Sequence, residues 1–265
     1  MYETNYHRPT SVEEAARLVG SAESGKFLSG GMSLLPAMKQ RLAAPSDLVD
    51  LRHVAEMRGI SVDGREIRIG GAVTHHEINV SAEIRSLCSG LHRMAGVIGD
   101  PQVRHMGTIG GSVANNDPAA DYPAAMIALD ATIHTNRRRL KASEFFVGLL
   151  ETALEDDEIL TAVSFTAPDI SGYEKFRNPA SRYAMCGVFV ARTGNSVRVG
   201  VTGAGADGVF SWDEAAQALS SSFSADAIAN LSVDPGGMLS DLHGSSEYRA
   251  NLVKVMAKRA VASAK

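Results

Sequence analysis

Two glycine pairs, each flanked by small hydroxyl side chains, are the features of this chain best suited to chemistry. The first is Ser29-Gly30-Gly31-Met32-Ser33, and the second is Thr108-Ile109-Gly110-Gly111-Ser112. Loops without side-chain bulk let backbone amides approach a ligand, and such amides beside a hydroxyl can bind phosphate oxygens without a cationic side chain. Two such nests would suit a diphosphate. Each pair alone is equally compatible with an ordinary tight turn, and neither matches GxGxxG or carries the lysine of a P-loop.

Two carboxylates follow the second glycine pair. Asp117 and Asp121 are four residues apart, and Pro118 between them indicates a turn. They have no partner pattern typical of catalytic acids. Two interpretations remain open: helix caps ahead of Pro123, or acceptors for the hydroxyls of a ribose or ribityl chain that would complete a dinucleotide site.

The other polar groups are less specific. His75 and His76 are adjacent, so on a helix they face apart and cannot chelate one metal together, which favours histidines at a helix start. Lys175 and Tyr183 fall in a segment that reads as an exposed strand and hairpin, or could offer a cation and an aromatic face to a cofactor. No Ser-His-Asp set with a recognisable local motif is present, so hydrolase chemistry has no support.

The composition is that of a soluble globular protein. The chain has 265 residues, 45% of them apolar, and a net charge of −4, which argues against a nucleic-acid binder. The basic run 137–139 indicates a solvated turn, or less often a docking patch. Cys88 and Cys186 lack metal-ligand spacing, so an iron–sulfur cluster within this chain is not expected. The N-terminus has no apolar signal region, and no stretch approaches about 18 apolar residues, so we expect a cytoplasmic protein without a membrane span.

The expected elements place both glycine pairs on loops. A capping box at Ser11 and Glu14 starts a helix, and the first pair lies between a strand and a helix. Turn formers at 167–172 indicate a domain boundary. The strands are expected at 26–28, 48–51, 67–69, 131–135, 138–141, 159–165, 173–177, 187–193 and 197–201, and helices from 12, at 34–40, from 75, and at 84–94, 212–219, 225–231 and 248–262.

Taken together, these segments resemble the flavoprotein (medium) subunit of the molybdenum hydroxylases. The matching segments are 26–36, Ile98-Gly99-Asp100-Pro101-Gln102-Val103-Arg104, 107–123 and Lys175-Phe176-Arg177. The resemblance implies an α+β chain. Its FAD-binding domain, of the vanillyl-alcohol-oxidase (PCMH) type, would cover 1–168 with subdomains at about 1–54 and 55–168. A C-terminal domain with a small antiparallel sheet and a helix bundle would follow at 172–265.

The resemblance also implies a set of FAD-binding residues. The two glycine loops would hold the diphosphate, Lys26 would lie at the adenosine end, and Ile98 would belong to the same site. Asp121 would contact the ribityl chain with Asp117 nearby, Lys175 would lie near the flavin, and Tyr183 beside the isoalloxazine. The diphosphate residues implied are Ser29, Gly30, Gly31, Met32 and Ser33 on one side and Thr108, Gly110, Gly111 and Ser112 on the other.

Two departures from the family pattern matter. Met32 stands where relatives commonly have His or Gln, so a side-chain hydrogen bond is lost, but a backbone nest does not need it. The cysteine-bearing insertion that holds a [4Fe–4S] cluster in relatives of 4-hydroxybenzoyl-CoA reductase is absent, which argues against that subgroup.

By this resemblance the chain is an oxidoreductase subunit that does not act on the substrate itself. Its non-covalent FAD would pass electrons from the [2Fe–2S] clusters of a small subunit to an external quinone, cytochrome or NAD. A large molybdopterin subunit would oxidise the substrate, in a dimer of heterotrimers that is cytoplasmic or associated with the inner face of the membrane. No catalytic or metal-binding residue is expected in this chain. The segments 115–118 and 175–183 look most like the carbon-monoxide-dehydrogenase branch; a xanthine, aldehyde or N-heterocycle dehydrogenase is the alternative.

Three other classes of function remain. A self-sufficient flavin oxidase with the same FAD fold would need a longer substrate domain than the roughly ninety residues after Gly172. An FAD enzyme of cell-wall precursor reduction would need a proton-donating Ser or Cys with a local match that we do not find. A non-enzymatic scaffold would use the glycine loops only as turns.

Overall fold

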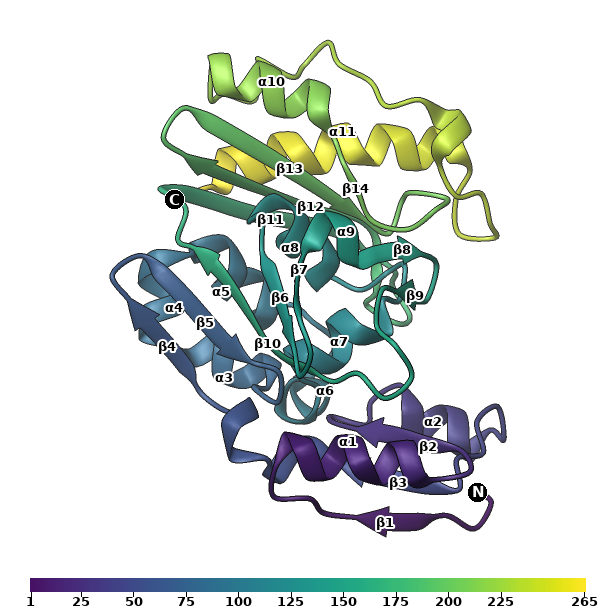
Figure 1. The fold of residues 1–265 in the computed structure, drawn as a ribbon. Helices are drawn as coiled ribbons and strands as arrows, with labels where there is room; N and C mark the ends of the chain where they lie inside the picture. Colours follow the sequence, from purple (N-terminus) through teal and green to yellow (C-terminus); the bar gives the residue numbers. More distant parts are fainter.

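The N-terminal part of the protein is a small parallel sheet with two helices. A computed structural model describes all residues, 1–265, and this part lies at one end of the molecule (Figure 1). Helix α1 begins at the expected cap, where the Ser11 hydroxyl accepts from the Glu14 amide, and its buried residues pack on Val49. The sheet has the strand order β1-β3-β2, and its elements are β1 (Asn5–His7), α1 (Val12–Ser21), β2 (Gly25–Leu28), α2 (Leu34–Lys39) and β3 (Asp47–Asp50).

The middle of the chain forms a five-stranded antiparallel sheet with the strand order β4-β5-β10-β6-β7. Along its strands apolar residues alternate with polar ones, so Ile67, Ile69 and Val163 are buried on one face while Arg68 is exposed on the other. Two short 3₁₀ helices, η1 (Leu51–His53) and η2 (Ala55–Met57), lead into it. The strands are β4 (Ile60–Asp63), β5 (Glu66–Gly70), β6 (Thr132–Thr135), β7 (Arg139–Lys141) and β10 (Leu160–Thr166).

Short helices and one hairpin complete this middle region. The predicted helix over 84–94 is broken at Cys88 into two helices. The loop expected at the second glycine pair is wrong, because Gly110 and Gly111 lie in the first turn of α7. The elements are α3 (His75–Val80), α4 (Ala82–Leu87), α5 (Ser89–Gly96), α6 (Pro101–Met106), α7 (Ile109–Asn115), α8 (Tyr122–Ala128), α9 (Ala142–Phe145), β8 (Phe146–Gly148) and β9 (Glu151–Thr152).

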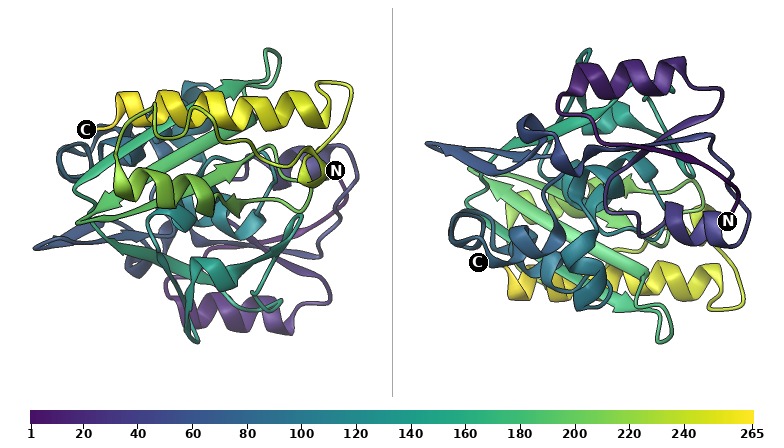
Figure 2. Two further views of the ribbon diagram at one scale, coloured as in Figure 1. Left: turned by 90° about the horizontal axis from the view of Figure 1, so that it is seen from above. Right: turned by 90° about the horizontal axis from the view of Figure 1, so that it is seen from below.

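The C-terminal part is a four-stranded antiparallel sheet between two layers of helices. Helices α5 and α8 contact one face of the sheet, while α10 and α11 cover the other, where α11 lies along β11 and β12 (Figure 2). A buried cluster that includes Tyr173 and Phe189 joins this sheet to the middle region. The elements are β11 (Ile170–Arg177), β12 (Ala184–Thr193), β13 (Ser196–Thr202), β14 (Phe210–Ser211), α10 (Asp213–Ser221), η3 (Pro235–Gly237) and α11 (Ser246–Ser263).

The predicted helix over 225–231 is wrong. These residues form consecutive turns in which the amides of Ala227, Ala229 and Leu231 each donate to the carbonyl three residues earlier, without the four-residue bonds of an α-helix. Ile228 is nevertheless fully buried in the C-terminal core. The spacing of apolar residues in this segment therefore arises from their burial against the sheet, and not from a helix.

Candidate functional site

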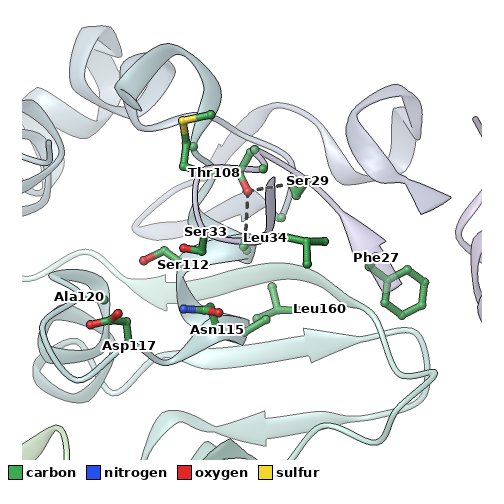
Figure 3. Close-up of a pocket in the computed structure, with 18 of the residues that line it drawn as sticks. Phe27, Ser29, Ser33, Leu34, Thr108, Ser112, Asn115, Asp117, Ala120 and Leu160 are labelled. Atoms are coloured by element: carbon green, nitrogen blue, oxygen red, sulfur yellow. Dashed lines mark hydrogen bonds between the residues drawn. The ribbon is translucent and has the colours of Figure 1, made fainter. Parts of the chain in front are cut away.

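A cavity of about 580 Å³ lies where the N-terminal part meets the middle region. Both glycine loops line it, together with residues from α7, from the segment before β10 and from the β11–β12 turn. Figure 3 shows Phe27 and Asp117 at opposite ends of the cavity, with Ser29 and Thr108 between them. All the predicted site residues line this cavity except Lys175.

The first glycine loop presents free backbone amides to the cavity. The N–H groups of residues 30–33 donate to no other group of the protein. Gly31 has a φ of +71°, a conformation that glycine adopts without steric cost, and a Cβ on Gly30 would lie 2.4 Å from the Met106 carbonyl oxygen. Glycine is therefore required at both positions, and the loop has the features of the predicted amide nest.

The second glycine loop differs from the prediction. The Gly110 amide donates to the Gly71 carbonyl oxygen at 3.0 Å, and the Gly111 amide donates to the Thr108 hydroxyl at 3.1 Å, as in an ordinary helix N-cap. The expectation of a second nest of free amides is therefore wrong for these two residues. Gly110 is small because the chain packs on Gly71, where a Cβ would lie 2.5 Å from the carbonyl oxygen.

The two loops contact each other directly. The hydroxyl oxygens of Ser29 and Thr108 are 2.8 Å apart, although the residues are separated by 79 positions in the chain (Figure 3). Ser112, one turn further along α7, also lines the cavity. The structure thus confirms that both loops line one cavity, where the first loop offers free amides and hydroxyl groups and the second offers hydroxyl groups.

Asp121 lies at one end of the cavity, and two buried side chains bind its carboxylate on the side away from the cavity. The Lys175 ammonium lies 2.8 Å from Oδ1 of Asp121, and the Tyr173 hydroxyl donates to the same carboxylate. The side chains of Lys175 and Asp121 are 2% and 5% exposed. Asp121 occupies the N-cap position of α8 but makes no capping hydrogen bond. Lys175 consequently lies behind Asp121 and does not line the cavity.

Asp117, Ile98 and Tyr183 complete this end. Oδ1 of Asp117 accepts from the Ala119 amide at 2.8 Å, and Asp117 and Ile98 both line the cavity. Tyr183 is 46% exposed at the end of the β11–β12 turn, so its ring forms part of the cavity mouth. Partial burial, with the nearby charges of Asp117 and Asp121, raises the pKa of the Tyr183 phenol.

The opposite end of the cavity is lined by apolar and charged side chains together. Lys26, Phe27 and Leu51 line it from the N-terminal part, and Leu160 from β10. Glu158 is a buried carboxylate in this lining, and hydrogen bonds from the Arg138 guanidinium, at 2.8 Å, are the main cause that lowers its pKa to about 2. The basic run at 137–139 therefore holds the turn between β6 and β7 against the acidic segment before β10.

His75 is a lining residue that sequence reasoning did not place in the site. It is 4% exposed, and burial, with the nearby charge of Arg104, lowers the pKa of its imidazole to about 3. The capping box of Thr74 and Glu77 predicts a helix start here and nothing about a cavity. No local signal could have found this role, because the cavity forms only when α3 pairs with the Gly107–Thr108 segment.

Two general properties complete the description of the site. No group of three or more His, Cys, Asp or Glu side chains is arranged to hold a metal ion. None of the helices combines the length and the apolar character needed to cross a membrane.

Comparison with known proteins defines the class. Residues 2–168 match the family described as the FAD binding domain in molybdopterin dehydrogenase, and the chain belongs to this family. It is 34% identical to the carbon monoxide dehydrogenase medium chain of Afipia carboxidovorans, over 98% of this chain and 96% of that one. It is 33% identical to the nicotine 6-hydroxylase medium subunit of Paenarthrobacter nicotinovorans, with the same coverage.

The fold agrees with this membership. Reconstituted CO dehydrogenase from Oligotropha carboxidovorans superposes with a TM-score of 0.87 at 32% identity, covering 98% of this chain and 97% of that one. The predicted family, the α+β FAD-binding fold and the FAD cofactor are thereby confirmed. The protein is an FAD-dependent oxidoreductase subunit.

Proposed function

We propose that this chain is the electron-transfer subunit of a heterotrimeric molybdenum hydroxylase of the carbon monoxide dehydrogenase type, and that it does not itself act on the substrate. The observation that supports it best is the Ser29–Thr108 contact, because it joins both glycine loops over one cavity with chemically different ends. A dinucleotide has the same order of parts: an adenosine, a diphosphate and a second ring system.

The residues present fit FAD. The free amides of residues 30–33 and the Ser29, Thr108 and Ser112 hydroxyls would hold the diphosphate. The end with Lys26 and Phe27 would take the adenosine, and the end with Asp117, Asp121 and Tyr183 would take the ribityl chain and the flavin. Asp121 has both carboxylate oxygens engaged by Tyr173 and Lys175, so it would present a fixed acceptor to ribityl hydroxyls.

In this mechanism the protein binds FAD and fixes its orientation. Bound FAD would supply the transfer of electrons singly or in pairs between two external partners. The free amides of the first loop and the hydroxyls of both loops would stabilise the diphosphate by hydrogen bonds without a cation, and the buried Lys175 compensates the charge of Asp121. Tyr183 would cover the exposed part of the flavin. No proton-transfer group of this chain is required.

The partners belong to this proposal. A small subunit with two [2Fe–2S] clusters would deliver electrons, a large molybdopterin subunit would oxidise the substrate, and the assembly would be a dimer of heterotrimers. A quinone, a cytochrome or NAD would accept the electrons. The relatives named above are medium chains, and this chain covers nearly their full length, which favours a subunit over a self-sufficient oxidase. We also propose 1–168 as the FAD-binding domain and 172–265 as a C-terminal domain.

An alternative substrate class has support of its own. The identity to a nicotine 6-hydroxylase medium subunit, 33%, is nearly that to the carbon monoxide dehydrogenase chain, 34%. The large subunit selects the substrate, so an N-heterocycle, xanthine or aldehyde dehydrogenase would use the same FAD site.

The test is to purify the chain and its complex and identify the chromophore. We expect the absorbance of oxidised flavin, with FAD released by acid in one equivalent per chain. A colourless protein that does not bind added FAD would contradict the proposal. Reduction of the flavin in the purified complex by carbon monoxide, but not by N-heterocycles or aldehydes, would separate the two substrate classes.

A further inference from the structure

His75 has one ring nitrogen engaged by the protein and one left open. Nδ1 lies 3.2 Å from the Tyr122 hydroxyl, whereas Nε2 makes no hydrogen bond within the protein. Although Nε2 has no hydrogen-bond partner, it is not fully enclosed by the protein and keeps some solvent-accessible surface. Because His75 is almost fully buried and lines the cavity, that surface faces the cavity.

The position of the open nitrogen is set by the second glycine loop. The His75 amide donates to the Gly107 carbonyl oxygen at 3.0 Å, and Thr74 forms an antiparallel bridge with Thr108. A Cβ on Gly107 would lie 2.6 Å from Nε2, so the imidazole packs directly on the backbone of Gly107. The open nitrogen therefore lies beside the loop whose own glycine amides are engaged within the protein.

The Tyr122 hydroxyl decides which nitrogen carries the proton. Tyr122 is fully buried and its hydroxyl has no other partner, and burial, with the charge of Asp121, keeps its pKa well above the ordinary value. If Nδ1 carried the proton, the phenol hydrogen would be buried without an acceptor, which is unfavourable. The phenol therefore donates to Nδ1, and the proton of the neutral imidazole is on Nε2.

We infer that His75 is a further cofactor-binding residue, whose Nε2–H donates to an oxygen of the linker between the adenosine and the flavin of FAD. The inference rests on the proposed function and adds to it a side-chain donor beside the second loop. A neutral donor suits this place, since burial lowers the pKa of His75 to about 3 and the ring is therefore uncharged at neutral pH. The acceptor is a diphosphate oxygen or a ribityl hydroxyl.

The experiment measures the affinity of FAD for the full chain, freed of its cofactor, in the wild type and in three variants. His75→Gln keeps an N–H near the Nε2 position, His75→Asn reaches only the Nδ1 position, and Tyr122→Phe removes the group that fixes the tautomer. We expect His75→Asn to bind FAD about ten-fold more weakly, because a hydrogen bond to a charged acceptor is lost. His75→Gln should remain within about three-fold of the wild type, and Tyr122→Phe should fall between them.

Competition by ADP distinguishes the two acceptors, because ADP contains the diphosphate but no ribityl chain. Equal weakening of ADP and FAD in His75→Asn assigns the diphosphate, and weakening of FAD alone assigns the ribityl chain. Equal FAD affinity in His75→Asn and wild type, or equal losses in the Asn and Gln variants, would show that the imidazole only fills space.

A measurement on the wild type tests the inference even if one of the variants does not fold. Nitrogen-15 spectra of labelled histidine should show the His75 proton on Nε2 and a shift of that signal on addition of FAD. A proton on Nδ1, or an Nε2 signal indifferent to FAD, overturns the inference. Failure of the wild type itself to bind FAD would instead overturn the proposed function.

Discussion

The ammonium of Lys175 and the carboxylate of Asp121 form a buried ion pair at 2.8 Å, although the residues are 54 positions apart. Lys175 comes from β11 and Asp121 from the start of α8, so the pair connects the C-terminal sheet to the end of the cavity. Tyr173, two residues before Lys175 on the same face of β11, donates to the same carboxylate. The end of the cavity with Asp121 is therefore part of a compensated polar cluster.

Replacement of Lys175 by Met should leave Asp121 buried without a cation. We expect a loss of about 3–5 kcal/mol of unfolding free energy, as for other broken buried pairs. The midpoint potential of bound flavin should also become more negative, since an uncompensated negative charge disfavours added electrons. Denaturant unfolding and a redox titration measure the two effects.

The control for this variant is Arg138→Met, which leaves the buried Glu158 without its cation at the opposite end of the same cavity. It should lower stability and leave the flavin potential unchanged. The double variant Asp121→Asn with Lys175→Met should recover much of the potential. An equal shift of potential in both single variants would contradict the role assigned to Lys175.

Gly111→Asp should abolish FAD binding. A Cβ at Gly111 would lie 3.0 Å from the Thr108 hydroxyl and 3.6 Å from the Ser29 Cβ, so the new carboxylate enters the space between the two loops. There it would repel a diphosphate. Gly111→Asn has nearly the same size without the charge and should retain more FAD. Flavin absorbance per chain after purification measures both, and full FAD content in Gly111→Asp would place the diphosphate elsewhere.

The Arg138–Glu158 pair should make stability depend on pH in the acid range. The folded-state pKa of Glu158 is lowered from an ordinary value of 4.5 to about 2. The stabilisation is therefore fully present above about pH 5 and is lost as the pH falls toward 2; because solvent screens the half-exposed Arg138, its size is about 1 kcal/mol. Urea unfolding of wild type and Arg138→Met at several pH values should show a stability difference that shrinks below about pH 4.5. A difference independent of pH would be inconsistent with this pair.

Tyr183→Ala should change the flavin environment more than the fold. The ring is nearly half exposed at the cavity mouth, so its removal should change the unfolding free energy by less than about 0.5 kcal/mol. Bound flavin should become more accessible to iodide, which quenches its fluorescence in solution. Tyr183→Phe keeps the ring and should behave as the wild type. Unchanged iodide access in the Ala variant would mean that Tyr183 does not cover the flavin.

Several parts of the fold and site could be predicted because their signals are local. The cap at Ser11, the strand and helix around the first glycine pair and the antiparallel strands after 172 depend on neighbouring residues. The helix expected over 225–231 failed because apolar residues that face a sheet from consecutive turns have helix-like spacing. The free amide expected at Gly110 is wrong because tertiary packing places the Gly71 carbonyl oxygen against it. The free amide expected at Gly111 is wrong because the Thr108 hydroxyl caps the helix there, a bond between neighbouring residues that the sequence could have indicated.

The sequence by itself determined the chemistry of the two glycine loops and the family resemblance, since small residues in a contiguous segment leave a backbone accessible wherever the segment is placed. Only the tertiary structure decided which groups meet. Thr108 lies against Ser29, Lys175 lies behind Asp121, and His75 turns Nε2 toward the cavity. Each of these relationships joins residues tens of positions apart, and such contacts form only when sheets and helices pack around a common core.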